Sequence, residues 1–231
     1  MHDEVSLGKK RPAPVDGTLR KFALRVPECI YKASGILVFG KRIKSLVFST
    51  DLCIIRNVNA DAIIAVYPFT PQPVITQALM LAADIPVFAG VGGGLTQGQR
   101  AINLAMFAEM QGATGVVLNA PTSNEVLEHV RHTVDIPVVM TVARSDTDIE
   151  ARLAAGADIF NVSAAAETPD IVQTQTGTGL LSRCRWLPCQ SESVPAGNSC
   201  AATFPQNVSG CISGCGGHKT RCFSSLSGRT V

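Results

Sequence analysis

The 231-residue sequence lacks the signatures of several large protein classes. It contains no apolar run near the roughly 18–20 residues that cross a bilayer, and no nucleophile elbow, H-E-x-x-H pair or Walker loop. Its formal net charge is only +2 and aromatic residues make up 5% of the chain. A basic surface with interleaved aromatic residues is therefore not expected, and we predict neither nucleic acid nor a membrane as partner.

The N-terminal segment also lacks the apolar core of a signal peptide. MHDEVSLGKKRPAPVDG carries charges and prolines instead. We therefore expect a flexible leader over residues 1–21 and a cytoplasmic protein whose cysteines stay reduced.

From residue 22 to residue 172 the chain alternates short apolar runs with amphipathic segments. Each run fits a strand buried on both faces of a parallel sheet, and each amphipathic segment fits a crossover helix. The expected strands after the first lie at 61–67, 85–91, 114–119, 136–142 and 157–163, and the helices between them at 74–83, 96–111, 123–134 and 146–156. This pattern predicts an α/β protein: a parallel (β/α) barrel of the TIM type, incomplete at about six β-α units.

The first of these units is preceded by a different pattern. ILVF and IKSLVFS, joined at Gly40-Lys41-Arg42, predict a hairpin or a bent strand over residues 36–49. Ser49-Thr50-Asp51 then predicts a helix N-cap before LCIIRNV.

Several segments together resemble a known family. They are NADAIIAVYPFTPQPVITQAL, ADIPVFAGVGGGLT, GATGVVLNAPTSNEVLEHV and DIPVVMTVARSDTDIEARLAAGADIFNVSAA. These segments look like the aldolase-type (β/α)8 barrels of the ribulose-phosphate-binding superfamily, and within it like a bacterial group labelled "hydrolase". The resemblance covers about residues 22–172. It implies two further β-α units and a Gly-Gly phosphate loop after the seventh strand, and the sequence beyond residue 172 predicts neither.

Residues 173–231 have a different composition, rich in Ser, Gly, Thr and Pro. Six of the eight cysteines lie here: Cys184, Cys189, Cys200, Cys211, Cys215 and Cys222. Three interpretations stay open: a zinc site near Cys211-x3-Cys215, a disulfide scaffold, and a disordered or frameshifted segment. The spacings lack paired C-x2-C knuckles and a cytoplasmic setting disfavours disulfides, so we expect the third. No metal or cofactor is predicted for the barrel.

In β/α barrels the active site lies at the C-terminal ends of the strands, and this rule selects the candidate site residues. The strongest local signal is Gly92-Gly93-Gly94-Leu95-Thr96, where main-chain N–H groups and a helix N-terminus can approach an anion. The alternative is that the glycines only turn a tight corner. Arg144 is a further candidate for pairing with a phosphate, and its alternative is a solvated loop arginine.

Four polar residues at strand ends are candidates for orienting the reacting carbon skeleton: Asn119, Thr141, Asn161 and Ser163. An inward amide there can bond a substrate hydroxyl or carbonyl, or the neighbouring backbone. Tyr67 can serve as an acid, or simply lie half-buried in the core.

These observations favour an enzyme-like barrel that binds a small phosphorylated or carboxylated metabolite. Lyase, isomerase and hydrolase chemistry all stay open. One alternative is a non-catalytic sensor that binds its ligand at the same C-terminal end of the barrel. Another is an inactive, truncated barrel that folds poorly or as a homo-oligomer.

Overall fold

The structure is a computed structural model that describes residues 24–67, 69–177 and 185–186. The predicted leader (1–21) and the six cysteines of the predicted tail lie outside the described residues. Among the described residues, no helix is both long and apolar enough to traverse a membrane.

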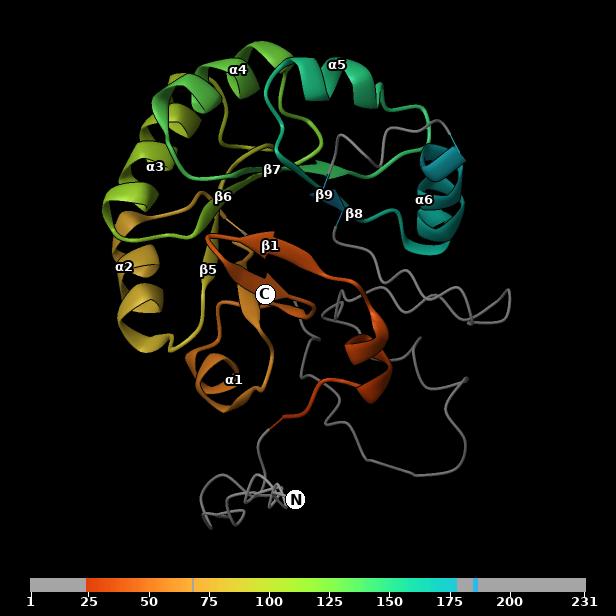
Figure 1. Cartoon of the computed structure of the whole chain (residues 1–231). Coiled ribbons are helices and arrows are strands. Elements are labelled where there is room, and N and C mark those ends of the chain that lie inside the picture. Colours follow the sequence, from red (N-terminus) through yellow and green to blue (C-terminus); the bar gives the residue numbers. More distant parts are fainter. Residues whose placement is uncertain (1–23, 68, 178–184, 187–231) are drawn as a thin grey trace, which may run out of the picture.

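The centre of the fold is a curved parallel sheet with helices on its convex side (Figure 1). Six strands pair in sequence order, and each neighbouring pair is parallel. They are β3 (Leu46–Phe48), β4 (Ala62–Ala65), β5 (Val87–Gly92), β6 (Gly115–Leu118), β7 (Val138–Val142) and β8 (Ile159–Val162). The predicted α/β half-barrel of about six parallel units is confirmed.

The helices between these strands overlap the predicted segments, although α3 and α5 each begin about three residues later than predicted. They are α1 (Leu52–Asn57), α2 (Pro73–Ala82), α3 (Gln99–Met110), α4 (Asn124–Thr133) and α5 (Ile149–Ala154). Three of them start at an acidic or hydroxyl N-cap: Asp51, Ser123 and Asp148 each accept a hydrogen bond from main-chain N–H of the first turn. Helix α2 starts instead with Pro73 at its first turn.

Two elements extend the fold past residue 172, where the sequence predicts the barrel segment to end. Helix α6 (Thr168–Gly177) continues five residues beyond that point, after the short 3-10 helix η3 (Ala165–Glu167). Strand β9 (Arg185–Trp186) then pairs in parallel with β8. The sequence did not predict β9, because two residues are too few to show a periodicity.

The sequence predicts a hairpin or a bent strand over residues 36–49, and the hairpin is present over a shorter range. It closes the N-terminal end of the sheet, whereas Leu46–Phe48 of the same predicted segment belongs to the parallel sheet as β3. Strands β1 (Ile36–Val38) and β2 (Lys41–Ile43) are antiparallel, and Phe39 and Gly40 form the turn, both with positive φ. Two left-handed residues in a two-residue loop match the twist of paired strands. A 3-10 helix, η2 (Glu28–Lys32), precedes the hairpin.

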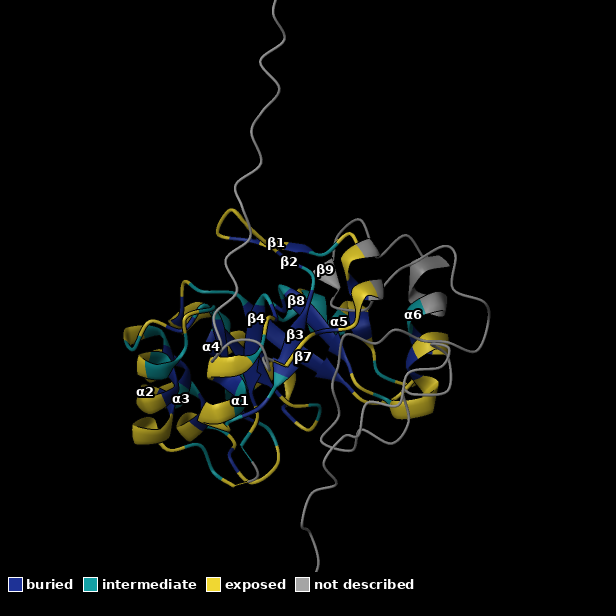
Figure 2. Cartoon of the chain, turned by 90° about the horizontal axis from the view of Figure 1, so that it is seen from below, coloured by how far each residue is buried: buried dark blue, intermediate teal, exposed yellow. Residues whose placement is uncertain are grey.

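Side chains alternate between two cores, as the strand period of two requires. One core faces the helices, with Leu118, Met140 and Phe160 among its members. The other fills the concave side, where the hairpin packs against the strands; its members include Ile36, Val38, Ile43, Ile64, Phe88, Val117, Val139 and Ile159. Figure 2 shows the strands buried and the outer helix faces exposed.

Carboxylates fix the N-terminal ends of the strands. Asp61, just before β4, accepts hydrogen bonds from the N–H groups of Lys44 and Ser45 at 2.8 and 3.0 Å and from the Ser45 hydroxyl. Asp158, just before β8, accepts in the same way from Val138 N–H at 2.9 Å. In both cases an acid at the start of one strand holds the start of the strand before it.

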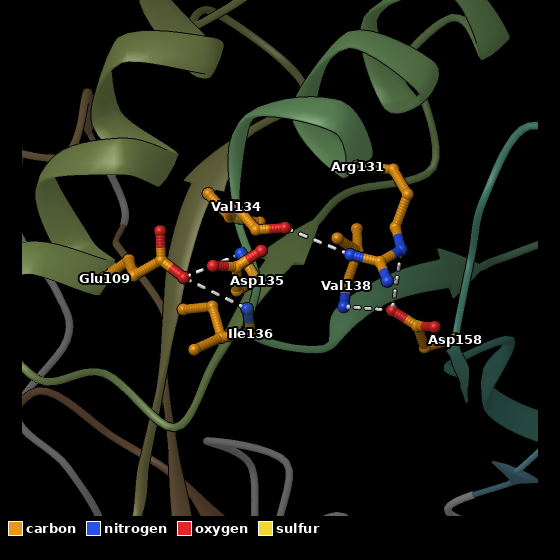
Figure 3. Close-up of polar contacts among 7 residues, drawn as sticks. All are labelled: Glu109, Arg131, Val134, Asp135, Ile136, Val138 and Asp158. Atoms are coloured by element: carbon orange, nitrogen blue, oxygen red, sulfur yellow. Dashed lines mark hydrogen bonds and ion pairs between the residues drawn. The ribbon is translucent and has the colours of Figure 1, made fainter.

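A third carboxylate reinforces β7 from a helix (Figure 3). Glu109 of α3 accepts from the N–H groups of Asp135 and Ile136, at 2.7 and 3.1 Å. Arg131 of α4 lies 3.6 Å from the Asp158 carboxylate and donates to the Val134 carbonyl. These acids therefore stabilise the N-terminal end of the sheet and do not line the cleft.

Replacing Asp61 by Ala should lower the free energy of unfolding by about 2 kcal/mol, because it leaves two main-chain N–H groups and one hydroxyl without their acceptor. Urea denaturation measures the loss. The matched control is Asp84→Ala, which removes only an exposed ion pair with Arg56 and should cost less than about 1 kcal/mol. Equal losses for the two variants would contradict the role of Asp61.

Candidate functional site

A cleft of about 370 Å³ opens at the C-terminal ends of the strands. The strand period explains which residues reach it. Ile64, Phe88, Val117, Val139 and Ile159 fill the interior, and the residues two positions further along each strand line the cleft: Val66, Gly90, Asn119, Thr141 and Asn161.

The structure brings most of the predicted site residues together. Asn119, Thr141, Asn161 and Ser163 line the cleft, and so do Gly92, Gly93, Gly94 and Thr96. We call the first four the polar wall. Whether these residues bind or convert a ligand stays a prediction.

Arg144 does not line the cleft. Its side chain is exposed and pairs with Asp146, with Nε–Oδ1 at 3.0 Å and Nη2–Oδ2 at 2.6 Å. This hydrogen-bonded pair raises the pKa of Arg144 and lowers the pKa of Asp146. Its role in anion binding stays a prediction that the cleft geometry does not support.

The polar wall has hydrogen-bonding capacity left over. Asn161 is buried, and its Nδ2 donates to Thr141 Oγ1 over 3.4 Å, a long contact. The two residues are register partners on β7 and β8. Thr141 can still donate its hydroxyl proton, and Asn161 can still accept at its carbonyl oxygen. This pair can orient a hydroxyl or carbonyl group of a ligand.

The opposite side of the cleft is apolar, which the sequence reasoning did not identify. Phe48, Val66, Phe69, Pro71 and Leu95 line it, and we call them the apolar wall. Val66 follows from the strand alternation that also selects Asn119. Phe69 and Leu95 lie in loops, where no periodicity points to them.

Among the described residues that line the cleft, none carries a formal charge, and Tyr67 alone has a weakly acidic side chain. Its hydroxyl lies 2.7 Å from Thr76 Oγ1 on α2. Burial raises the pKa of Tyr67 above its ordinary value, and the Thr76 hydrogen bond opposes that shift. Within the described part of the chain, no three His, Cys, Asp or Glu residues gather closely enough to hold a metal ion.

The glycine loop, residues 92–98, is longer than the sequence predicts. Helix α3 begins at Gln99 rather than near residue 96, with Gly98 as its N-cap. Gly93, Gly94 and Gly98 all have positive φ. The Gly93 N–H donates to the Thr96 carbonyl at 2.8 Å, so this donor is already used within the loop.

Thr96 is the unusual member of this loop. It lines the cleft and is 2% exposed. Its hydroxyl is shielded from solvent and has no hydrogen-bond partner among the described residues. A buried hydroxyl without a partner costs about 1–3 kcal/mol, so the loop holds an unsatisfied polar group beside the cleft.

The likeness of this chain to known proteins is limited to distant structural matches. No family model matches the sequence, and no curated protein matches it. Among solved structures, a phosphonopyruvate hydrolase complexed with oxalate and Mg²⁺ matches at 13% identity and TM-score 0.49, covering 59% of this chain and 64% of that one.

Two dihydrodipicolinate synthases match in a similar way. A monomeric variant has 18% identity and TM-score 0.46, covering 60% of this chain and 59% of that one. The Agrobacterium tumefaciens protein has 15% identity and TM-score 0.43, covering 68% and 61%. This chain therefore spans less than two thirds of the length of these three proteins. These likenesses concern the barrel fold alone.

Replacing Gly93 by Ala should be costly, because the new Cβ would lie 2.5 Å from Asn119 Cβ and the residue has φ near +94°. We expect the free energy of unfolding to fall by about 2–4 kcal/mol. Gly94→Ala is the control: its φ is +85°, but its Cβ would meet open space, so only about 1–2 kcal/mol of backbone strain is expected. Thermal and urea unfolding compare the two. A Gly94 variant as unstable as the Gly93 variant would contradict the contact with Asn119.

Tyr67 should ionise above the ordinary tyrosine pKa of 10.0. A folded-state pKa raised above the unfolded value stabilises the protonated fold; this contribution is complete below the unfolded pKa and disappears as pH rises through the folded one. Ultraviolet titration measures it directly, because the chain has two tyrosines, Tyr31 and Tyr67. Tyr67→Phe should remove the late-ionising component, and an unchanged titration curve would contradict the assignment.

Proposed function

We propose that this chain binds a small metabolite at the C-terminal rim of its half-barrel, and that the metabolite carries an anionic group together with a hydroxyl or carbonyl. One observation carries the proposal: the four residues of the polar wall and the glycine loop, which are far apart in sequence, line a single cleft. Its volume of about 370 Å³ falls within the range of pockets that hold small ligands.

In this proposal the glycine loop holds the anion. The N–H groups of Gly94 and Leu95 have no acceptor within the described part of the chain, and the Thr96 hydroxyl lacks a partner there as well. Donors without acceptors beside a cleft favour a ligand that supplies oxygen atoms. A phosphate and a carboxylate both do so.

The polar wall would orient the reacting part of the ligand. Thr141 would donate to a ligand oxygen and Asn161 would accept from a ligand hydroxyl, while Asn119 and Ser163 extend the same surface. Rate enhancement on such a surface would come from positioning and from fixed dipoles. The proposal covers lyase, isomerase and hydrolase chemistry. It also includes a relation to the ribulose-phosphate-binding barrels and a cytoplasmic location.

A specific observation favours a second candidate, a non-catalytic sensor. Within the ranges that the structure describes, the cleft lining includes no carboxylate, histidine, lysine or cysteine. Tyr67 is the one ionisable group, and its hydroxyl is bonded to Thr76. A binding function needs no acid–base group, whereas proton transfer does.

Binding and turnover separate the two candidates. The full chain is screened by thermal shift against inorganic phosphate, ribose 5-phosphate and pyruvate, and each stabilising compound is then followed by NMR for conversion. Stabilisation with turnover supports the enzyme, and stabilisation without turnover supports the sensor. If no compound stabilises the chain, the proposed anion site is wrong.

Asn161→Ala and Thr141→Val should each weaken binding of a stabilising compound about tenfold, the effect of losing one well-formed hydrogen bond. Isothermal titration calorimetry measures the affinity. Asn103→Ala, at an exposed position on α3, is the control and should leave the affinity unchanged. Equal affinities for all three variants would show that the ligand does not contact the polar wall.

A further inference from the structure

The two walls of the cleft differ in chemistry along the order of the strands. The apolar wall comes from the last residue of β3 and from the segments after β4 and β5. The polar wall comes from the C-terminal ends of β6, β7 and β8 and the residues directly after β6 and β8. On the apolar side the Tyr67 hydroxyl is bonded to Thr76, and the Thr96 hydroxyl is shielded from solvent without a partner among the described residues. A ligand lying across the cleft would therefore meet an apolar surface on one side and amides and hydroxyls on the other.

Two residues of the apolar wall are unusually exposed. Phe69 is 78% and Leu95 is 86% exposed, and they lie in the adjacent loops after β4 and β5. Single exposed apolar side chains are common on protein surfaces. Here, however, the two side chains line the same cleft, and Leu95 lies between Gly94 and Thr96 in the loop proposed to hold the anion.

We infer that the ligand is amphipathic: an apolar group, aromatic or branched aliphatic, packs against Phe69 and Leu95 while its anionic end lies on the glycine loop. This inference rests on the proposed anion site and goes beyond it, because it names the second half of the ligand. When the apolar group of the ligand packs against Phe69 and Leu95, it removes apolar surface of both side chains from water, and this burial increases the binding affinity. The absence of charge from the lining residues fits a ligand that is only partly polar.

Paired probes test the inference. Inorganic phosphate is compared with phenyl phosphate, and pyruvate with phenylpyruvate, by isothermal titration calorimetry on the full chain. In each pair the anion is shared and only the phenyl ring is added. We expect the phenyl member to bind at least about tenfold more tightly.

Variants then show which side chains cause the preference for the phenyl probes. The variant Phe69→Ser should lose most of the preference for the phenyl probes while keeping its affinity for inorganic phosphate or pyruvate, because Phe69 is not part of the proposed anion site. The Phe69 side chain is mostly exposed, so the fold should be unaffected. Leu81→Ser is the matched control: Leu81 is 82% exposed, lies on α2 and does not line the cleft, so the preference should persist.

The outcomes distinguish the two proposals. Equal affinity within both pairs, or a full preference that survives in the Phe69→Ser variant, overturns the amphipathic ligand and leaves the anion site standing. No binding of any of the four probes overturns the anion site and this inference with it.

Discussion

Parallel pairing in strict sequence order is the constraint on which the rest of this structure depends. Each strand from β4 to β8 must start at the same end of the sheet and finish at the other, with a helix returning the chain between them. Residues that end successive strands therefore meet at one rim. Asn119, Thr141 and Asn161 share a cleft for this reason, although more than forty positions separate the first from the last.

The same constraint divides the molecule into two ends with different chemistry. At the N-terminal end, Asp61 and Asp158 fix strand starts through main-chain N–H groups, and the hairpin fills the interior. At the C-terminal end the lining residues have no formal charge. The carboxylates that a motif search would notice thus stabilise the fold, and the residues at the cleft are ones that carry little signal individually.

This division explains how far the sequence could predict the structure. Buried runs such as Ala62–Ala65 and Val138–Val142 are located by their continuous apolar composition, and the polar wall follows from them by counting along the strand. Loop positions have no such pattern. Phe69 and Leu95 could not be found in this way, and the loop before Gln99 proved longer than the glycines suggest. The pairing of Arg144 with Asp146 depends on a local turn, which the sequence leaves undetermined.

The glycine loop shows where sequence reasoning about an anion site needs the structure. Three glycines in a row suggest a cradle of N–H donors, yet the Gly93 N–H donates to the Thr96 carbonyl, and a Cβ at Gly93 would lie 2.5 Å from Asn119 Cβ. Gly93 is therefore a packing residue that couples the loop to the polar wall. The main-chain donors of this loop without an acceptor in the described part of the chain are those of Gly94 and Leu95, and the shielded Thr96 hydroxyl lacks a partner there as well. In the proposed anion site the donors would therefore come from the residues after Gly93 and not from Gly93 itself.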